Sequence, residues 1–329
     1  MRSTRSLVAL TPFVFLFVLG QSVGCGGTDN DFSKKPAAVD PDNGPVDTNQ
    51  TKAIRIANYN TKNLFNDVVD GETQAIKESE ALDLPSTDAY QAKLANVADV
   101  LAGLDADIVV LQEVENEAVL SDLVKQPALV GAGKTYTNLA LFPGNDPRGI
   151  DVGVISRFPL TETVSHKEAK IGFENQGYSR DCLEVHVDFN SRELILLGIH
   201  FRSQVDQGAS DGDAKRLAEA KYTRALADKL ALTSPRAGIL VLGDFNDFPG
   251  QPTMNAIASP PPPFTSAVSL LPANEAYTVT FAASGKKIYD DQWANPIMAG
   301  FRDAGSVMLV HDRTDVSDHS PVAVTYVVK

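Results

Sequence analysis

Oxygen-bearing side chains follow directly on an apolar run in residues 238–250, which makes this stretch the strongest candidate for chemistry. Gly238 to Leu242 is predicted to be a buried strand, and Asp244 and Asn246 follow it before a Pro-Gly turn. These two side chains share one face of an extended chain, because side chains alternate with period two. Burying both is costly unless they bind something, and a metal ion or a phosphate with its metal fits them. Taken alone, the stretch is equally explained as a turn rich in Asp and Asn.

Three other predicted strands end in the same way, in polar side chains. The strand 53–60 ends at Asn60, the strand 107–115 contains Glu113 near its end, and the strand 194–199 is followed directly by His200. Because four strand ends share this signature, one common binding site explains them better than four separate turns.

The elements between these strands repeat a plan of strand, helix and strand. Residues 88–104, with Asp88 and Gln91 as a capping pair, and residues 213–232 are predicted to be helices. Their inward-facing residues are expected to be Leu94, Val97, Ala98, Leu101 and Leu104 in the first helix, and Leu217, Ala218, Tyr222, Ala225 and Leu226 in the second. Two such layers facing each other predict an α/β sandwich with helices outside and one polar cleft at the strand ends.

Further polar groups stand in or near other predicted strands. They are Asp151 within residues 149–159, Asp290 and Asp291 within residues 289–292, and Asp318 and His319 just before the strand 322–328. No group of Cys and His has the spacing of a zinc site. Carboxylates and amides suit Mg²⁺, Mn²⁺ or Ca²⁺, and histidines among carboxylates suit acid–base catalysis near neutral pH.

The N-terminal residues are predicted to direct export. Arg2 and Arg5 precede an apolar run from Leu7 to Leu19, which has the pattern of a secretory signal and is short for a membrane span. The small residues before Cys25 resemble the lipobox of bacterial lipoproteins. Residues 1–24 are therefore expected to be a signal peptide and Cys25 to be acylated, which anchors the chain at a membrane surface.

Composition places one large domain behind a linker. Residues 25–52 are rich in Asp, Pro, Gly, Asn and Thr and are predicted to be flexible, whereas residues 53–329 suffice for one substantial core. Cys182 would be a lone thiol packed in a strand, so no disulfide is expected. The formal net charge of −13 has the wrong sign for a protein that holds nucleic acid on a broad basic surface.

Five motifs resemble, in order, those of the endonuclease/exonuclease/phosphatase superfamily. They are Asn58-Tyr59-Asn60, Leu111-Gln112-Glu113-Val114, Gly198-Ile199-His200-Phe201, Gly243-Asp244-Phe245-Asn246 and Ser317-Asp318-His319-Ser320-Pro321. The resemblance extends from about Ile54 to the C-terminus. It implies a four-layer α/β sandwich and metal-dependent phosphoester hydrolysis with Mg²⁺, or Mn²⁺ or Ca²⁺.

The matching positions imply roles for the strand-end residues. Glu113 would be the principal metal ligand, helped by Asn60 and Asp318. Asp244 and Asn246 would position the attacking water and the phosphate. The superfamily often has an acidic residue two places after the asparagine of the first motif, where this chain has a lysine, so a single metal is favoured over two.

The resemblance also implies roles for both histidines. His319 would act as a base or as a phosphate-stabilising cation, and Asp291 takes the place of the carboxylate that pairs with it, with Asp290 as its rival. His200 would contact the phosphate or protonate the leaving oxygen. Asp151 either orients His200 or pairs with a neighbouring arginine, Arg148 or Arg157.

The segment that begins at His200 is similar to extracellular bacterial nucleases of the superfamily, in which a basic residue two places on matches Arg202, a candidate phosphate ligand. We therefore expect an exported, monomeric nuclease that acts on DNA or RNA. It would be a lipoprotein of the bacterial cell envelope, at the outer membrane, or be secreted.

Two alternatives stay open for the function. The first is a phosphatase or a sphingomyelinase-like phosphodiesterase that acts on small or lipid phosphoesters. The second is a surface lipoprotein that binds a partner without catalysis. The second predicts loss of at least one motif residue, yet Glu113, Asp244, Asn246, Asp318 and His319 are all present.

Overall fold

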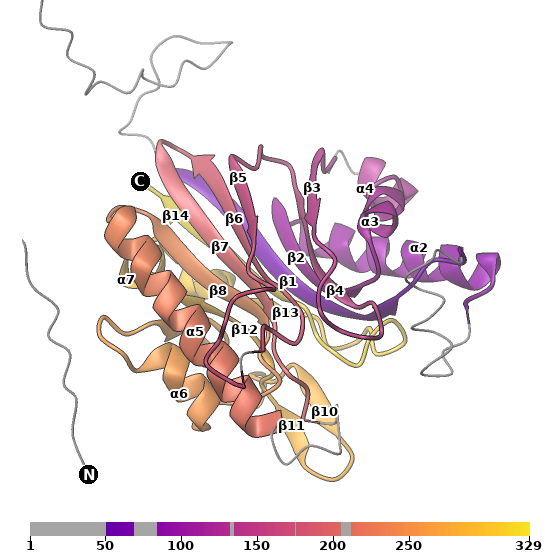
Figure 1. Cartoon of the computed structure of the whole chain (residues 1–329). Coiled ribbons are helices and arrows are strands. Elements are labelled where there is room, and N and C mark those ends of the chain that lie inside the picture. The colour runs from indigo at the N-terminus through magenta and orange to yellow at the C-terminus, as the bar shows by residue number, and fades with distance from the viewer. Residues whose placement is uncertain (1–50, 69–83, 132–134, 175, 205–211) are drawn as a thin grey trace, which may run out of the picture. The chain divides into compact units, whose positions relative to one another are not determined.

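Two mixed β-sheets pack face to face in the computed structural model, which describes residues 51–68, 84–131, 135–174, 176–204 and 212–329 (Figure 1). Among the described residues, the first sheet has the order β13 (Met308–Leu309), β14 (Val322–Val328), β1 (Lys52–Leu64), β2 (Ile108–Val114), β4 (Asp151–Ser156) and β3 (Asn138–Leu141). The second has the order β5 (Glu162–Ser165), β6 (Cys182–Phe189), β7 (Arg192–His200), β8 (Gly238–Asp244), β12 (Asp290–Ala294) and β9 (Thr265–Ser266). The expected signal peptide, the acylated Cys25 and nearly all of the linker lie outside the described residues.

Each sheet contains one parallel pair of strands joined by a long helix, as the doubled sequence pattern predicted. The helix α2 (Thr87–Leu104) joins β1 to β2, and the helix α5 (Gly212–Thr233) joins β7 to β8. Parallel strands run in the same direction, so their carboxyl ends lie at the same edge of the sheet. In the second pair, His200 of β7 lies beside Asp244 of β8.

Helices cover the outer faces of both sheets and complete the four-layer α/β sandwich (Figure 1). The first sheet is covered by α2, α3 (Glu117–Leu123) and α4 (Pro127–Val130), and the second by α5 and α6 (Pro252–Ala258). The inner faces share a core of fully buried side chains such as Ile56, Val110 and Leu242. Each contributes about 1.5–3 kcal/mol by burial, which makes the sandwich a rigid support for its edges. The shorter elements are α7 (Pro296–Phe301), η1 (Val268–Leu270), η2 (Ala304–Ser306) and the hairpin β10 (Val279–Phe281) with β11 (Gly285–Lys287).

Local features follow the sequence with small differences. The side chain of Ser86, rather than the pair Asp88 and Gln91, caps α2 by accepting a hydrogen bond from Ala89 N at 3.2 Å. Cys182 is fully buried in β6, as expected for a packed strand residue. None of the helices described is long and apolar enough to cross a membrane.

The inward face of α5 differs from the prediction. Its buried residues include Arg216, Glu219 and Arg224, whereas Leu217 is half-buried and Ala225 is exposed. The buried face of α5 was predicted from its apolar residues, and this criterion was wrong. Charged side chains of α5 are buried because they contact the backbone of neighbouring loops.

Two of these charges illustrate how the loops are held. Glu219 accepts hydrogen bonds from the backbone N–H of Ser179 at 2.6 Å and of Arg202 at 2.7 Å. Arg224 donates to the carbonyls of Ile257, Pro260 and Pro262 at 2.6–2.7 Å. Burial of a charge is tolerated when such partners replace water. The helix therefore fixes the loops on both sides of the β7–β8 strand ends.

Two histidines share one carboxylate on the outer strands of the second sheet. Glu184 lies 2.8 Å from His166 Nε2 and 2.7 Å from His186 Nε2, and His186 Nδ1 lies 3.0 Å from Glu193. Burial disfavours charge on both His186 and Glu184, but their hydrogen bonds outweigh it. They raise the pKa of His186 to about 9 and lower the pKa of Glu184 to about 2.

This cluster predicts a pH window of stability. The contribution of His186 is complete below its ordinary pKa of 6.5 and is lost as the pH rises through about 9. That of Glu184 is complete above its ordinary pKa of 4.5 and is lost as the pH falls through about 2. We expect His186→Gln to lower the free energy of unfolding by about 2 kcal/mol at pH 5.5, and by much less at pH 10. Urea unfolding at both pH values checks this, and an equal loss at both would contradict it.

Candidate active site

The carboxyl ends of β1, β2, β7 and β8 bring four predicted site residues together across the two sheets. The side-chain amide of Asn60 donates from Nδ2 to Glu113 Oε1 at 3.1 Å and to Asp244 Oδ2 at 3.0 Å. His200 Nε2 lies 3.5 Å from the same Asp244 oxygen and 4.0 Å from Glu113 Oε1. Two carboxylates, one from each sheet, thus face one amide and one imidazole.

Left-handed backbone aims several of these side chains. Glu113, where the pairing of β2 with β4 is interrupted, has a φ of 63°, and Asn246, Lys62 and Asn63 have φ values of 49°, 55° and 53°. Such non-glycine conformations cost about 1–3 kcal/mol each and persist only where their surroundings hold them. Here Asn63 N donates to Glu113 Oε2 at 2.9 Å. Four non-glycine residues with left-handed backbone thus lie at or next to the cleft.

His200 is buried and uncharged at neutral pH. Burial, reinforced by the positive charges of Arg180, His319 and Arg148, holds the pKa of His200 well below its usual value. Its Nδ1 has no hydrogen-bond partner among the described residues. This nitrogen is itself buried, so the ring presents its Nε2, which faces Asp244 and Glu113, to the cleft.

His319 is the opposite case, a cationic histidine. Its Nδ1 lies 2.8 Å from Asp290 Oδ2 and its Nε2 lies 3.9 Å from Asp244 Oδ2. Burial alone would lower the pKa of His319, but the charges of Asp290 and Asp244 outweigh it and raise the pKa to about 10. The Asp290 carboxylate fixes Nδ1 as the donor, so Nε2 faces Asp244 across the cleft.

Asp291 is not the partner of His319, which corrects the assignment made from the sequence. Neighbouring residues of a strand point to opposite faces, and in β12 it is Asp290 that faces the cleft. Asp291 instead accepts hydrogen bonds from Ser266 Oγ at 2.5 Å, Ala267 N at 3.1 Å and Val268 N at 3.0 Å. It stabilises the turn that follows β9.

The residues present fit a divalent metal. Glu113 and Asp244 offer carboxylate oxygens, and burial raises the pKa of Asp244 to about 7, so its charge is poorly compensated until a cation arrives. Hard oxygen donors of this kind suit Mg²⁺, Mn²⁺ or Ca²⁺. Asp290 and His319 also have ligand atoms within 4.8 Å of Asp244, but they are already bonded to each other. Glu113 with Asp244 is therefore the better pair of metal ligands.

Two predicted metal ligands are placed differently from expectation. Asn60 Oδ1 accepts a hydrogen bond from Lys62 N at 3.0 Å, so the amide turns its NH₂ group, not its oxygen, toward the carboxylates. The side chain of Asp318 is 62% exposed and pairs with Lys62 Nζ at 3.3 Å. Lys62 stands where the superfamily often has an acidic residue, and its ammonium group forms an exposed ion pair with Asp318.

Asn246 is fixed behind the cleft by its backbone and its amide. Its N–H donates to Asp244 Oδ1 at 2.8 Å, and its Nδ2 donates to the carbonyl of Phe201 at 3.1 Å. The same carbonyl accepts a hydrogen bond from Arg180 Nη1 at 3.2 Å, and this fully buried guanidinium pairs with Asp146 at 2.7 Å. The loop after His200 is therefore tied to the loop after Asp244.

Asp151 does not orient His200. Its Oδ1 accepts a hydrogen bond from Gly144 N at 2.7 Å, and burial raises its pKa to about 7. The alternative, an ion pair of Asp151 with Arg148 or Arg157, is also wrong, because both arginines pair with other aspartates. The Asp151 carboxylate stabilises the turn before β4 through this hydrogen bond with Gly144.

Arg202 is held in place by two residues of α5 that were not predicted to belong to the site. Its backbone N–H donates to Glu219 and its carbonyl accepts from Arg216 Nη1 at 3.0 Å, while its side chain is half-buried. A contact of Arg202 with substrate phosphate stays a prediction. A buried helix face has residues three and four positions apart, and this is the spacing of Arg216, Glu219 and Thr223. The face could not be recognised from the sequence because these residues are polar.

Paired carboxylates beside one uncharged and one cationic histidine define a site for metal-dependent hydrolysis of phosphate esters. A sequence model of the Endonuclease/Exonuclease/phosphatase family matches residues 55–295. The chain belongs to this family and is a metal-dependent phosphoric ester hydrolase.

Solved structures share the fold at low sequence identity. TDP2 from Caenorhabditis elegans is 15% identical with a TM-score of 0.56, covering 84% of this chain and 75% of that one. A family protein from Leptotrichia buccalis is 12% identical with a TM-score of 0.55, covering 84% of this chain and 100% of that one. One from Beutenbergia cavernae is 16% identical with a TM-score of 0.55, covering 84% and 72%. No curated protein matches the sequence.

The neighbouring aspartates Asp290 and Asp291 provide a matched pair of variants. Asp290→Asn is expected to lower kcat by about 100-fold or more, because His319 loses the carboxylate that orients it and stabilises its charge. Asp291→Asn is expected to keep kcat and to lower stability by about 1–3 kcal/mol, because one of the two oxygens that accept hydrogen bonds from the turn after β9 is replaced by an NH₂ group. Kinetics on bis-p-nitrophenyl phosphate and thermal unfolding test both, and the reverse pattern would refute the assignment.

Proposed function

We propose that this protein is an exported, divalent-metal-dependent phosphodiesterase that cleaves nucleic acid. The observation that carries the proposal is the convergence of Glu113, Asp244, His200 and His319, from both sheets, on one cleft. These residues supply two anionic ligands, one uncharged imidazole and one cationic imidazole within a few ångströms. Diester hydrolysis needs such groups on both sides of the phosphorus.

Each side chain has a part in this scheme. Glu113 and Asp244 hold the metal, which when bound offsets charge on the phosphate oxygens. His319, held by Asp290, stabilises the negative charge that develops in the transition state. His200, uncharged and with Nε2 facing the two carboxylates, contacts the phosphate and handles a proton at the leaving oxygen.

A cluster of aromatic and basic side chains at the β10–β11 hairpin favours nucleic acid over a small diester. Lys286 Nζ lies 3.7 Å from the centre of the Tyr277 ring, which stacks on His311 at 3.9 Å. Lys287 Nζ lies 4.2 Å from the centre of the Phe248 ring. Cations interleaved with aromatic rings are the usual means of binding a single strand through phosphates and bases.

This hairpin is fastened directly to the catalytic histidine. Val279 of β10 pairs with His319, and Thr278 O accepts a hydrogen bond from Ser320 N at 2.7 Å. A strand lying on the hairpin would therefore reach the cleft. A lipid substrate is less well supported, because the exposed large hydrophobic side chains among the described residues come from separate elements and not from the hairpin.

The cellular setting is proposed from residues 1–52 and from the similarity to extracellular bacterial nucleases. A signal peptide over residues 1–24, an acylated Cys25 and a flexible linker would present the catalytic domain, as a monomer, from the bacterial outer membrane. Membrane contact would be confined to the lipid anchor. Phosphatase activity and sphingomyelinase-like activity are the alternatives that assays must exclude.

Metal removal and two substitutions test the chemistry. The purified protein is expected to degrade plasmid DNA or RNA and to hydrolyse bis-p-nitrophenyl phosphate with Mg²⁺, Mn²⁺ or Ca²⁺, and to stop with EDTA. Glu113→Gln and His319→Ala should each lower turnover by about 100-fold or more. Asp318→Asn is the control, expected within a few-fold of wild type because its side chain is exposed. Hydrolysis of the small diester with intact polymers would shift the assignment to a small or lipid substrate.

The hairpin lysines predict how polymer cleavage responds to salt. The double variant Lys286→Ala/Lys287→Ala should lower kcat/KM on DNA relative to bis-p-nitrophenyl phosphate. The slope of log kcat/KM against log salt should become shallower by about 0.7–0.9 for each phosphate contact removed. The exposed α5 lysines in Lys221→Ala/Lys229→Ala serve as the control of equal charge. An identical slope in both double variants would contradict strand binding by the hairpin.

A further inference from the structure

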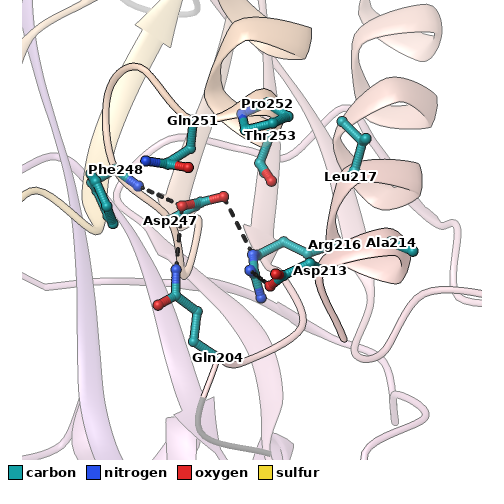
Figure 2. A pocket seen from close by; sticks show the side chains of 10 residues that line it. All are labelled: Gln204, Asp213, Ala214, Arg216, Leu217, Asp247, Phe248, Gln251, Pro252 and Thr253. Carbon is teal, nitrogen blue, oxygen red and sulfur yellow. Dashed lines mark hydrogen bonds and ion pairs between the residues drawn. The ribbon is translucent and has the colours of Figure 1, made fainter. Parts of the chain in front are cut away.

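A pocket of about 610 Å³ opens beside the catalytic cleft, between the loop after β8 and the first turns of α5 and α6 (Figure 2). This volume lies within the range of about 300–1,000 Å³ that is typical of small-molecule sites. The scheme proposed above uses none of its lining residues in catalysis. Figure 2 shows Asp247 at its centre, with Arg216 and Asp213 on one side and Gln204 below.

The pocket lies next to the scissile position by chain connectivity and by hydrogen bonds. Asp247 directly follows Asn246, and consecutive Cα atoms are about 3.8 Å apart. Gln204, which lines the pocket, donates to Asp247 at 3.3 Å and accepts from the hydroxyl of Tyr289 at 2.9 Å. Burial and the charges of Asp244 and Asp247 raise the pKa of Tyr289 to about 12, so its hydroxyl is within electrostatic reach of both the catalytic carboxylate and the pocket carboxylate. A group joined to the reacting phosphate can therefore extend toward the pocket.

The charged side chains that line the pocket exclude a second phosphate group from it. Arg216 is the one basic residue that lines the pocket, and its side chain is only 3% exposed. Its guanidinium is engaged by Asp213, by Asp247 at 3.5 Å and by the carbonyl of Arg202 at 3.0 Å. Two carboxylates against one enclosed cation leave the wall acidic, so the occupant is uncharged or cationic.

The remaining surface favours an uncharged, flat occupant. Leu217 and Pro252 provide apolar walls, and Gln251 and Thr253 provide an amide and a hydroxyl. The ring of Phe248 already carries Lys287 at 4.2 Å from its centre, which repels a second cation there. Apolar walls with amide and carboxylate edges match a nucleobase, which is flat and bears both donors and acceptors.

We propose that this pocket is a nucleoside subsite, which binds the base joined to the scissile phosphate and so selects nucleotide esters among phosphodiesters. The inference rests on the proposed function. It specifies that the substrate is recognised by a base as well as by phosphates. Loss of the contacts with one base is expected to lower kcat/KM by about tenfold.

The test compares three esters that share p-nitrophenol as leaving group. They are the p-nitrophenyl ester of thymidine 5′-monophosphate, bis-p-nitrophenyl phosphate and p-nitrophenyl phosphorylcholine. The full chain should prefer the thymidine ester. Leu217→Trp, which fills the pocket, should lower kcat/KM for the thymidine ester relative to bis-p-nitrophenyl phosphate by about tenfold. Leu232→Trp, at the 82% exposed end of the same helix, is the matched control and should keep the ratio.

Each outcome decides the inference. Gln251→Ala is measured as well, in case Leu217→Trp fails to fold, and it should lower the same ratio. Hydrolysis of the esters with an unchanged ratio in both folded variants would overturn the subsite and leave the proposed function intact. Preference for phosphorylcholine, lost selectively in Leu217→Trp, would replace the base with a quaternary ammonium group. Failure on all three esters would overturn the proposed function, and the subsite with it.

Discussion

The active cleft depends on one unfavourable arrangement, two carboxylates held against each other at the edge of two sheets. Glu113 and Asp244 accept hydrogen bonds from the same Nδ2 atom of Asn60, so they are neighbours in a site that water barely reaches. Burial and the neighbouring charge of Asp290 disfavour the charged form of Asp244 and raise its pKa to about 7, which the cationic His319 and the Asn60 amide only partly offset. A divalent cation removes the conflict, so metal dependence follows from the packing of the sheets.

The rest of the molecule keeps this arrangement from relaxing. The carboxylates stand on β2 and β8, whose inner faces belong to one close-packed core, so they cannot move apart without opening the sandwich. The loops beyond the strand ends are fixed by buried charges: Glu219 and Arg216 hold the backbone of Arg202, and Arg180 holds the carbonyl of Phe201. The left-handed backbone at Glu113 is supported by the hydrogen bonds that its carboxylate accepts from Asn63 N and Asn60 Nδ2.

The sequence predicted what apolar patterning determines and missed what depends on register and on polar contacts between distant segments. Parallel pairs and helices follow from buried runs, and the motif residues of four strand ends were correctly brought together. Asp290 and Asp291 could not be told apart, because one residue of register reverses the face of a strand. Asp318 was expected among the metal ligands, but its exposed side chain pairs with Lys62, more than 250 residues away along the chain, and sequence spacing gives no sign of such a contact. The buried charges of α5 were missed because an amphipathic pattern assumes apolar inward faces.

The proposed action on nucleic acid, a polyanion, is compatible with the acidic composition of this protein once distance is considered. The formal net charge is −13, but exposed charges farther apart than about 8–10 Å are screened at physiological salt. Under the proposed function, a nucleic-acid strand on the β10–β11 hairpin would therefore be governed by Lys286 and Lys287 and by a cation at the carboxylates, rather than by the distant surface. Net repulsion weakens overall affinity for the polymer and for its cleaved ends. Weak retention suits an enzyme that degrades successive strands, since turnover then depends on release as much as on capture.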